Sequence, residues 1–182
     1  MLYTNSSWEK IHTGVFKNGN QIISHQLAFF ASSGPLFLGG FFIFFAAVHT
    51  GIQYFNHVLS WKNLQSLDII LFATAIFGGW LITKGRAGLE VRKEHGGIHP
   101  NDTLIVLDST TQDVMKQKGM TEERIGTFAN MQLSIRMDRS GKNVKYRIEA
   151  IFPEKKERIA TTNNRTHAEK LLQEIKSHLH IS

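Results

Sequence analysis

The chain has 182 residues, a formal net charge of +6 and no cysteine. The lack of cysteine excludes a disulfide scaffold, a cysteine-based zinc module, and thiol catalysis or iron–sulfur ligation by this chain. Only five of its 36 charged residues precede position 84. Its mean hydropathy of −0.17 is therefore the average of a nearly uncharged N-terminal part and a highly charged C-terminal part. This distribution argues against a single soluble globule or a disordered chain, and it favours a membrane-anchored protein with one small polar domain.

Residues 1–26 are mostly polar and are predicted to form a cytoplasmic N-terminal segment of their own. Residues 27–52 have a phenylalanine-rich apolar centre and contain no acidic or basic residue. A 26-residue helix, at about 1.5 Å per residue, exceeds the roughly 30 Å hydrocarbon core of a bilayer. A first transmembrane span is therefore predicted, with Pro35 at its true start or at a kink. A secretory signal peptide is the alternative, but its basic leader would directly precede the apolar run.

Residues 64–83 are predicted to form the second span of a transmembrane hairpin, residues 27–83. The span carries one charge, Asp68, near its start, and tryptophan and lysine flank it on both sides. These residue types are typical of membrane interfaces. The predicted membrane anchors are Trp61, Lys62, Trp80 and Lys84.

Basic residues near the span ends predict the orientation. They are more frequent in the two outer flanks than in the connecting loop, so both termini are predicted to be cytoplasmic. The residues concerned are Lys10 and Lys17 before the first span, Lys62 in the loop, and Lys84, Arg86, Arg92 and Lys93 after the second span. Two small-xxx-small pairs, Ala47 with Gly51 and Ala75 with Gly79, are predicted to pack the spans together, with a seam between copies of the chain as the alternative.

Residues 84–102 are predicted to form a glycine-containing juxtamembrane connector, and residues 103–182 a cytoplasmic α+β domain of three or four strands with a C-terminal helix. The apolar run Thr103–Leu107 predicts a strand. The capping-box form of Ser109–Gln112 predicts a short helix that continues to Lys118.

Alternating apolar and polar residues in Met131–Met137 and Val144–Phe152 predict an antiparallel hairpin. Arg158–Thr162 can supply a third strand. Thr166–Glu169 then opens a final helix with one apolar face, which consists of Ala168, Leu171, Leu172, Ile175 and Leu179. A sheet covered by this helix would bury the apolar faces of both.

The predicted β-hairpin of residues 131–152 carries the only candidate residues for binding an anion. Three basic side chains are predicted on one sheet face and two at its tip, and together they could bind phosphate groups of nucleic acid or anionic lipid. These residues are Arg136, Lys145 and Arg147 on the face, and Arg139 and Lys142 at the tip. A solvated face is the alternative, because Glu149, Glu154 and Glu157 interrupt the positive charge and no aromatic platform accompanies it.

No catalytic, metal-binding or cofactor-binding residues are predicted. The Gly141–Lys142 pair lacks the upstream glycine and the following serine or threonine of a phosphate loop. His95 and His99 lie four residues apart, but no acidic partner at a recognised spacing converges on them, which favours a surface role. We therefore expect a protein that is not an enzyme.

Residues 18–30 resemble the N-terminal signature of F-type conjugative coupling proteins, the TraD family, at the start of the first of their two membrane helices. Several segments after the second span are similar to the juxtamembrane part of that family: Lys84–Arg86, Gly96–Gly97, Gln117–Gly119 and Arg124–Gly126. Ala28 replaces the family's arginine, and no Walker motif follows. The resemblance implies a multi-pass protein of the bacterial inner membrane, associated with a type IV secretion apparatus, without an ATPase motor.

The sequence therefore predicts a non-enzymatic inner-membrane anchor or adaptor that docks the protein partners of a membrane complex, such as a type IV secretion or conjugation apparatus. Its expected partners are membrane lipid and proteins, with a homo-oligomer as an open alternative and nucleic acid less favoured. A membrane-tethered module that binds DNA or lipid headgroups is one alternative function. An assembly factor for a membrane complex is another, and it would have the same architecture.

Overall fold

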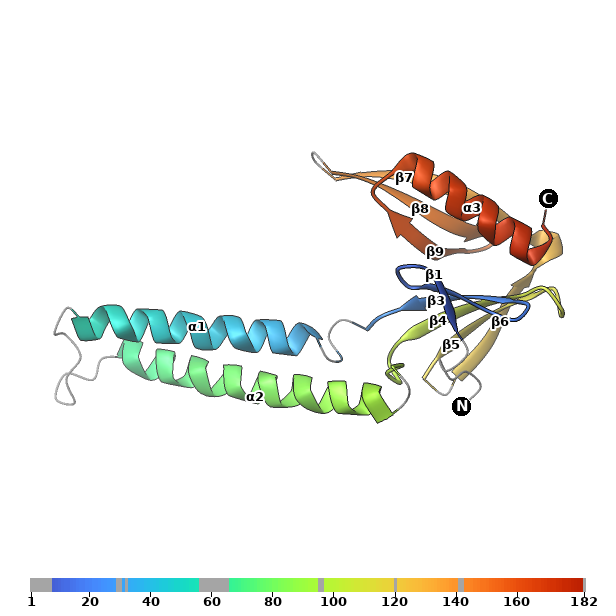
Figure 1. The fold of residues 1–182 in the computed structure, drawn as a ribbon. Coiled ribbons are helices and arrows are strands. Elements are labelled where there is room, and N and C mark those ends of the chain that lie inside the picture. Colours follow the sequence, from blue (N-terminus) through green and yellow to red (C-terminus); the bar gives the residue numbers. More distant parts are fainter. Residues whose placement is uncertain are drawn as a thin grey trace. The chain divides into compact units, whose positions relative to one another are not determined.

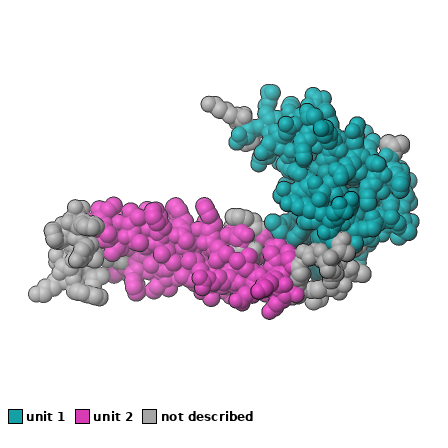
Figure 2. Space-filling view, viewed as in Figure 1, with its two compact units in different colours: residues 1–27, 100–182 teal, residues 28–99 magenta. Residues whose placement is uncertain are grey.

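The computed structural model describes residues 8–28, 31, 33–55, 66–94, 97–119, 121–140 and 143–181. The chain divides into two compact units, one of residues 1–27 and 100–182 and the other of residues 28–99 (Figures 1 and 2). The first is a β-sheet unit with one helix, and the second is a helical hairpin.

The described residues form nine strands, three α-helices and one 3₁₀ turn. In chain order they are β1 (Glu9–His12), β2 (Val15–Asn18), β3 (Gln21–Gln26), α1 (Ser33–Phe55), α2 (Ser66–Glu94), β4 (Thr103–Asp108), β5 (Asp113–Lys118), β6 (Thr121–Thr127), η4 (Phe128–Asn130), β7 (Gln132–Ser140), β8 (Asn143–Ile151), β9 (Lys156–Thr162) and α3 (Arg165–Leu179).

The larger sheet joins strands from both sides of the helical hairpin. Its six antiparallel strands follow the order β1-β2-β3-β4-β5-β6, and β3 pairs with β4 from Gln21↔Asp108 to Gln26↔Thr103. Residues 1–26 are predicted from the sequence to be a separate segment, whereas the structure builds the strands of residues 9–26 into this sheet. Strands this short carry little local signal, and the pairing that stabilises them is made with residues beyond the hairpin.

The predicted hairpin is confirmed as β7 and β8, and β9 completes a three-stranded antiparallel sheet with the order β7-β8-β9. The prediction of three or four strands was too low, because it missed β1, β2, β3, β5 and β6. The short helix predicted after Ser109 was also wrong, since Asp113–Lys118 forms β5. Val114 is fully buried there and lies opposite Leu107, so packing within the sheet overrides the local helix signal.

The capping signal at Ser109–Gln112 belongs to the turn between β4 and β5. Asp108 Oδ1 accepts hydrogen bonds from the backbone N–H of Thr110 at 2.8 Å and of Thr111 at 3.4 Å, and Oδ2 accepts one at 2.7 Å from Gln21 Nε2 on β3. Partial burial raises the pKa of Asp108, but these hydrogen bonds outweigh it and hold the pKa below its usual value. The carboxylate therefore stabilises a turn rather than a helix.

The apolar core of this unit combines residues from both sheets and from α3. Ile22 and Leu107 come from the larger sheet, Ile148 from the smaller one, and Ile175 from α3, and each is fully buried. The predicted apolar face of α3 is confirmed, with Ala168, Leu171, Ile175 and Leu179 buried and Leu172 partly buried. The N-cap is Asn164 rather than Thr166, because the Asn164 side chain accepts the N–H of His167.

The two sheets are also joined by a buried hydrogen bond. Ser24 of β3 is only 1% exposed, and its Oγ donates to the backbone carbonyl of Ile159 in β9 at 2.7 Å. A second, solvent-exposed hydrogen bond joins the same two strands: Gln26 Nε2 of β3 donates to the backbone carbonyl of Arg158 in β9 at 2.7 Å. These bonds connect an N-terminal strand to the last strand of the chain.

The second unit consists of α1 and α2, which are both long and apolar enough to cross a membrane by length and composition. Pro35 lies in the first turn of α1, where proline is tolerated, so it marks the start of the helix. α2 continues to Glu94 and takes in much of the predicted connector 84–102. Its last turn carries Arg92 and Lys93, which interact favourably with the C-terminal end of the helix dipole.

Replacing Ser24 with alanine should destabilise the β-sheet unit by about 1–3 kcal/mol, because the buried carbonyl of Ile159 loses its donor. Amide hydrogen exchange of β3 and β9, measured on the full chain in detergent, reports this loss. Ser177→Ala is the matched control, since the Ser177 side chain is exposed on α3. Equal protection in the two variants would show that the Ser24 bond contributes nothing.

Candidate functional site

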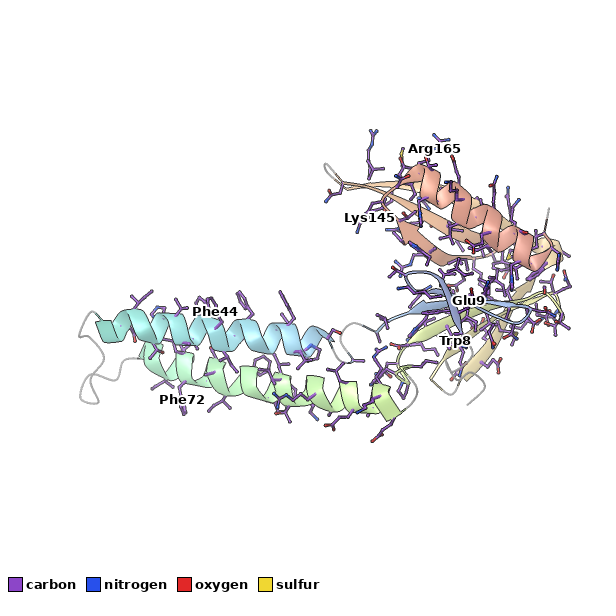
Figure 3. All side chains as sticks on the ribbon, in the orientation of Figure 1. Trp8, Glu9, Phe44, Phe72, Lys145 and Arg165 are labelled. Carbon is purple, nitrogen blue, oxygen red and sulfur yellow. The ribbon has the colours of Figure 1, made fainter. Side chains whose placement is uncertain are left out.

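The helical hairpin exposes an unusually large apolar surface. Phe44 of α1 is 68% exposed and Phe72 of α2 is 71% exposed, and the two rings project away from the partner helix on opposite sides of the hairpin (Figure 3). The other exposed large side chains are Phe37, Phe41, Ile43, Phe45, Val48, Ile52, Ile69, Ile70, Ile76, Phe77, Trp80 and Leu89. A surface of this size on a soluble monomer would be an aggregation hazard, so it marks a site that lipid or protein covers.

The two helices approach each other closely at a pair of glycines. A Cβ atom on Gly39 would lie 2.6 Å from the carbonyl oxygen of Gly78, and one on Gly78 would lie 2.9 Å from the carbonyl oxygen of Gly39. The predicted small-residue pairs do not make this contact: Ala47 is exposed, and Cβ atoms on Gly51 and Gly79 would meet no atom within 4 Å. The spacing of small residues indicated close packing, but it did not identify which residues face the partner helix.

Two of the predicted membrane anchors form a contact on α2. Lys84 Nζ lies 5.8 Å from the ring centroid of Trp80, within range of a cation–π interaction. The Trp80 ring also stacks on Phe77, with centroids 5.7 Å apart. The end of the apolar part of α2 thus carries the aromatic and basic pair expected at a membrane interface. The other two anchors, Trp61 and Lys62, lie outside the described residues.

Within the described residues of the hairpin, two buried polar atoms have no hydrogen-bond partner. They are His49 Nδ1 and Gln53 Oε1, one turn apart on α1. Two hydroxyl groups of α2 are satisfied by their own helix: Thr74 Oγ1 donates to the carbonyl of Ile70, and Thr83 Oγ1 donates to that of Gly79. Unsatisfied polar atoms are costly inside a bilayer, so the end of α1 that holds His49 and Gln53 suits a position near its boundary.

The register of β7 and β8 places four exposed or half-buried charged residues on one sheet face, which we call the charged face: Arg136, Asp138, Lys145 and Arg147. Arg136 lies opposite Arg147, and Asp138 lies opposite Lys145. Asp138 forms an ion pair with Arg147 and neutralises part of the predicted positive charge. Arg136 and Lys145 are exposed, so they are the residues of this face most available to an anion or an acidic partner.

The remaining predicted binding residues are not on the charged face. Arg139 lies opposite Val144, which places it on the other side of the sheet, and Lys142 lies outside the described residues. Glu149 lies two residues from Arg147 on the side of the charged face and is only 7% exposed. The structure thus gathers three of the five predicted basic residues, together with two acidic ones, which is a mixed rather than a purely basic surface.

Two histidine contacts that the sequence does not predict link distant parts of the chain. His25 Nε2 lies 2.7 Å from Asp102 Oδ2, and the Asp102 side chain is fully buried. His167 Nε2 lies 3.2 Å from His12 Nδ1. The partners are 77 and 155 residues apart in the sequence, so no local spacing could have revealed them.

No group of three or more histidine, cysteine, aspartate or glutamate side chains gathers at a metal-binding distance in the part of the chain that the structure describes. The His95–His99 pair is not tested, because His95 lies outside those residues.

No protein-family model, curated protein or solved structure matches this chain. The resemblance to conjugative coupling proteins therefore stays a prediction from the sequence.

Replacing Gly39 with isoleucine should separate α1 from α2, because overpacking against the carbonyl of Gly78 costs about 1–3 kcal/mol. The chain has no cysteine, so a cysteine pair at Phe42 and Phe77, whose rings lie 5.7 Å apart, can report the separation by the yield of a short crosslink. Gly40→Ile is the matched control, since a Cβ there meets no atom within 4 Å. The yield should fall in the first variant and hold in the second, and equal yields would contradict the packing.

Proposed function

We propose that this chain is a non-enzymatic membrane anchor and adaptor, in which the helical hairpin crosses a lipid bilayer and the β-sheet unit docks protein partners. The supporting observation is the hairpin's surface: only 11% of the most apolar stretch of α1 and 17% of that of α2 are buried within the protein. Lipid is the environment that covers such a surface on all sides, and both helices satisfy their backbone hydrogen bonds internally, as a bilayer requires.

The pairing of β3 with β4 supports a hairpin that enters and leaves on the same side of the membrane. β3 ends at Gln26 before the hairpin, β4 begins at Thr103 after it, and these two residues are partners in one sheet. A sheet cannot form across a bilayer, so the two flanks of the hairpin share one compartment. The excess of basic residues in these flanks favours the cytoplasm, and a bacterial inner membrane would suit this orientation.

The docking role is assigned to the charged face of the smaller sheet. Its exposed Arg136 and Lys145 offer two cations beside the neutralised pair of Arg147 and Asp138. A mixed charge pattern of this kind gives specificity for a complementary protein surface. A subunit of a type IV secretion or conjugation complex is one such partner, and a client of an assembly factor is another.

The anchor is tested by cysteine accessibility in intact and inverted membranes. Thr13→Cys on the β1–β2 turn and Lys170→Cys on α3 should react with an impermeant maleimide only from the cytoplasmic side, and Ser60→Cys only from the other side. The wild-type chain has no cysteine and gives the blank. Labelling of all three positions from one side, or release of the protein by alkaline carbonate, would contradict a membrane-spanning hairpin.

The docking face is tested by a photo-crosslinking amino acid at Lys145, with Lys170 on the exposed side of α3 as the matched control position. In native membranes, irradiation should give a protein adduct of defined mass at position 145 and none at 170. Arg136→Glu in the same chain should reduce that adduct, because it reverses a charge of the docking face.

The alternative function, binding of anionic headgroups or DNA by the same face, predicts a lipid or nucleotide adduct that weakens as salt is raised. Such an adduct at position 145, without a protein adduct, would replace the adaptor proposal. Equal protein adducts at positions 145 and 170 would show that the charged face has no special role.

A further inference from the structure

The contact between His12 and His167 joins the first strand of the β-sheet unit to its C-terminal helix. His12 is the last residue of β1, the edge strand of the larger sheet, and His167 lies in the first turn of α3. His12 Nδ1 and His167 Nε2 are 3.2 Å apart, and the ring centroids are 5.0 Å apart. His12 is half-buried and His167 is exposed, so solvent reaches one side of the pair.

The second nitrogen of His12 determines which atom carries the proton. His12 Nε2 lies 3.2 Å from the backbone carbonyl oxygen of Thr161 in β9, which can only accept a hydrogen bond. Nε2 of the neutral ring is therefore the N–H donor, and Nδ1 presents its lone pair to His167. This is the arrangement of a metal-ligating histidine, which commonly donates its other ring N–H to a backbone carbonyl.

From this geometry we infer that His12 Nδ1 and His167 Nε2 form a binding site for a transition-metal ion of the Zn²⁺ class. Two nitrogens that share a tetrahedral zinc ion at about 2.0–2.1 Å are about 3.3–3.4 Å apart, close to the separation already present. In the absence of metal, His167 Nε2 carries the proton that it donates to His12 Nδ1. When this proton moves through solvent to His167 Nδ1, the lone pair of His167 Nε2 becomes available to the metal, and the ring neither gains nor loses a proton overall. Water on the exposed side completes the coordination sphere, because no third protein ligand lies nearby in the described part of the chain.

A metal ion at this site would clamp the N-terminal strands to the C-terminal helix. β1 pairs with β2 alone in the sheet and is its edge strand. An ion held by His12 and His167 binds only when β1 and α3 are both in place, so it stabilises the β-sheet unit by mass action. The inference concerns this unit alone and does not depend on the proposed membrane insertion or on the charged face.

The test is titration of the full chain in detergent with Zn²⁺ alone, in a non-coordinating buffer near pH 7.5, followed by calorimetry and by thermal unfolding. The wild-type chain should bind one equivalent and unfold at a higher temperature when Zn²⁺ is present. His167→Gln should weaken binding at least tenfold and abolish the thermal shift. The His167 ring is exposed and its backbone N–H is held by Asn164, so this variant keeps the helix cap.

The matched control is a double variant, His95→Gln with His99→Gln, which removes the pair of histidines that the sequence places four residues apart. This variant should bind Zn²⁺ as the wild type does. Co²⁺ in place of Zn²⁺ gives a second measurement on the unmodified chain, since its visible absorption reports nitrogen ligands in a tetrahedral site. Failure of the wild type to bind, equal binding by His167→Gln, or loss of binding only in the His95 and His99 variant would each overturn the inference.

Discussion

The pairing of β3 with β4 is the constraint on which the rest of the structure depends. It joins six consecutive residue pairs across an insertion that contains both long helices. Without it, β1, β2 and β3 would be an isolated meander too small to be stable alone, and β4 would become an edge strand that exposes its backbone. The same pairing brings Ser24 to Ile159 and keeps both flanks of the hairpin in one folded unit. Because it closes a long loop, it is also the slowest kind of contact to form.

The parts of the fold that could be predicted from sequence are those that carry a local pattern. The alternation in β7 and β8, the apolar face of α3 and the apolar runs of α1 and α2 are each visible within a short window. The role of residues 9–26 could not be read in this way, because strands of four to six residues gain their stability from partners far along the chain. At β5 the local signal was misleading, since the Asp108 hydrogen bonds that resemble a helix cap close a β-turn.

The candidate sites also differ in whether a local sequence pattern or a contact between distant residues defines them. The basic residues of the charged face were found because they sit on a strongly alternating hairpin, although the pairing of Arg147 with Asp138 depends on a diagonal contact that only the register defines. The glycines were recognised as packing residues, but rotation of the helices decided that Gly39 and Gly78, rather than Gly51 and Gly79, face each other. The His12–His167 contact joins the first strand to the last helix, and nothing in the sequence around either residue marks it.

The position of the hairpin within the sheet bears on how such a protein could arise and be redesigned. Gln26 and Thr103 lie side by side as paired residues at the ends of β3 and β4, at a spacing of about 5 Å that an ordinary β-turn bridges. The whole helical unit is therefore a module inserted into a strand–turn–strand connection, with its two attachment points adjacent. In the described part of the chain, the sheet order and the apolar core of the β-sheet unit use no residue of the helical unit, so the two units are separable parts of one fold.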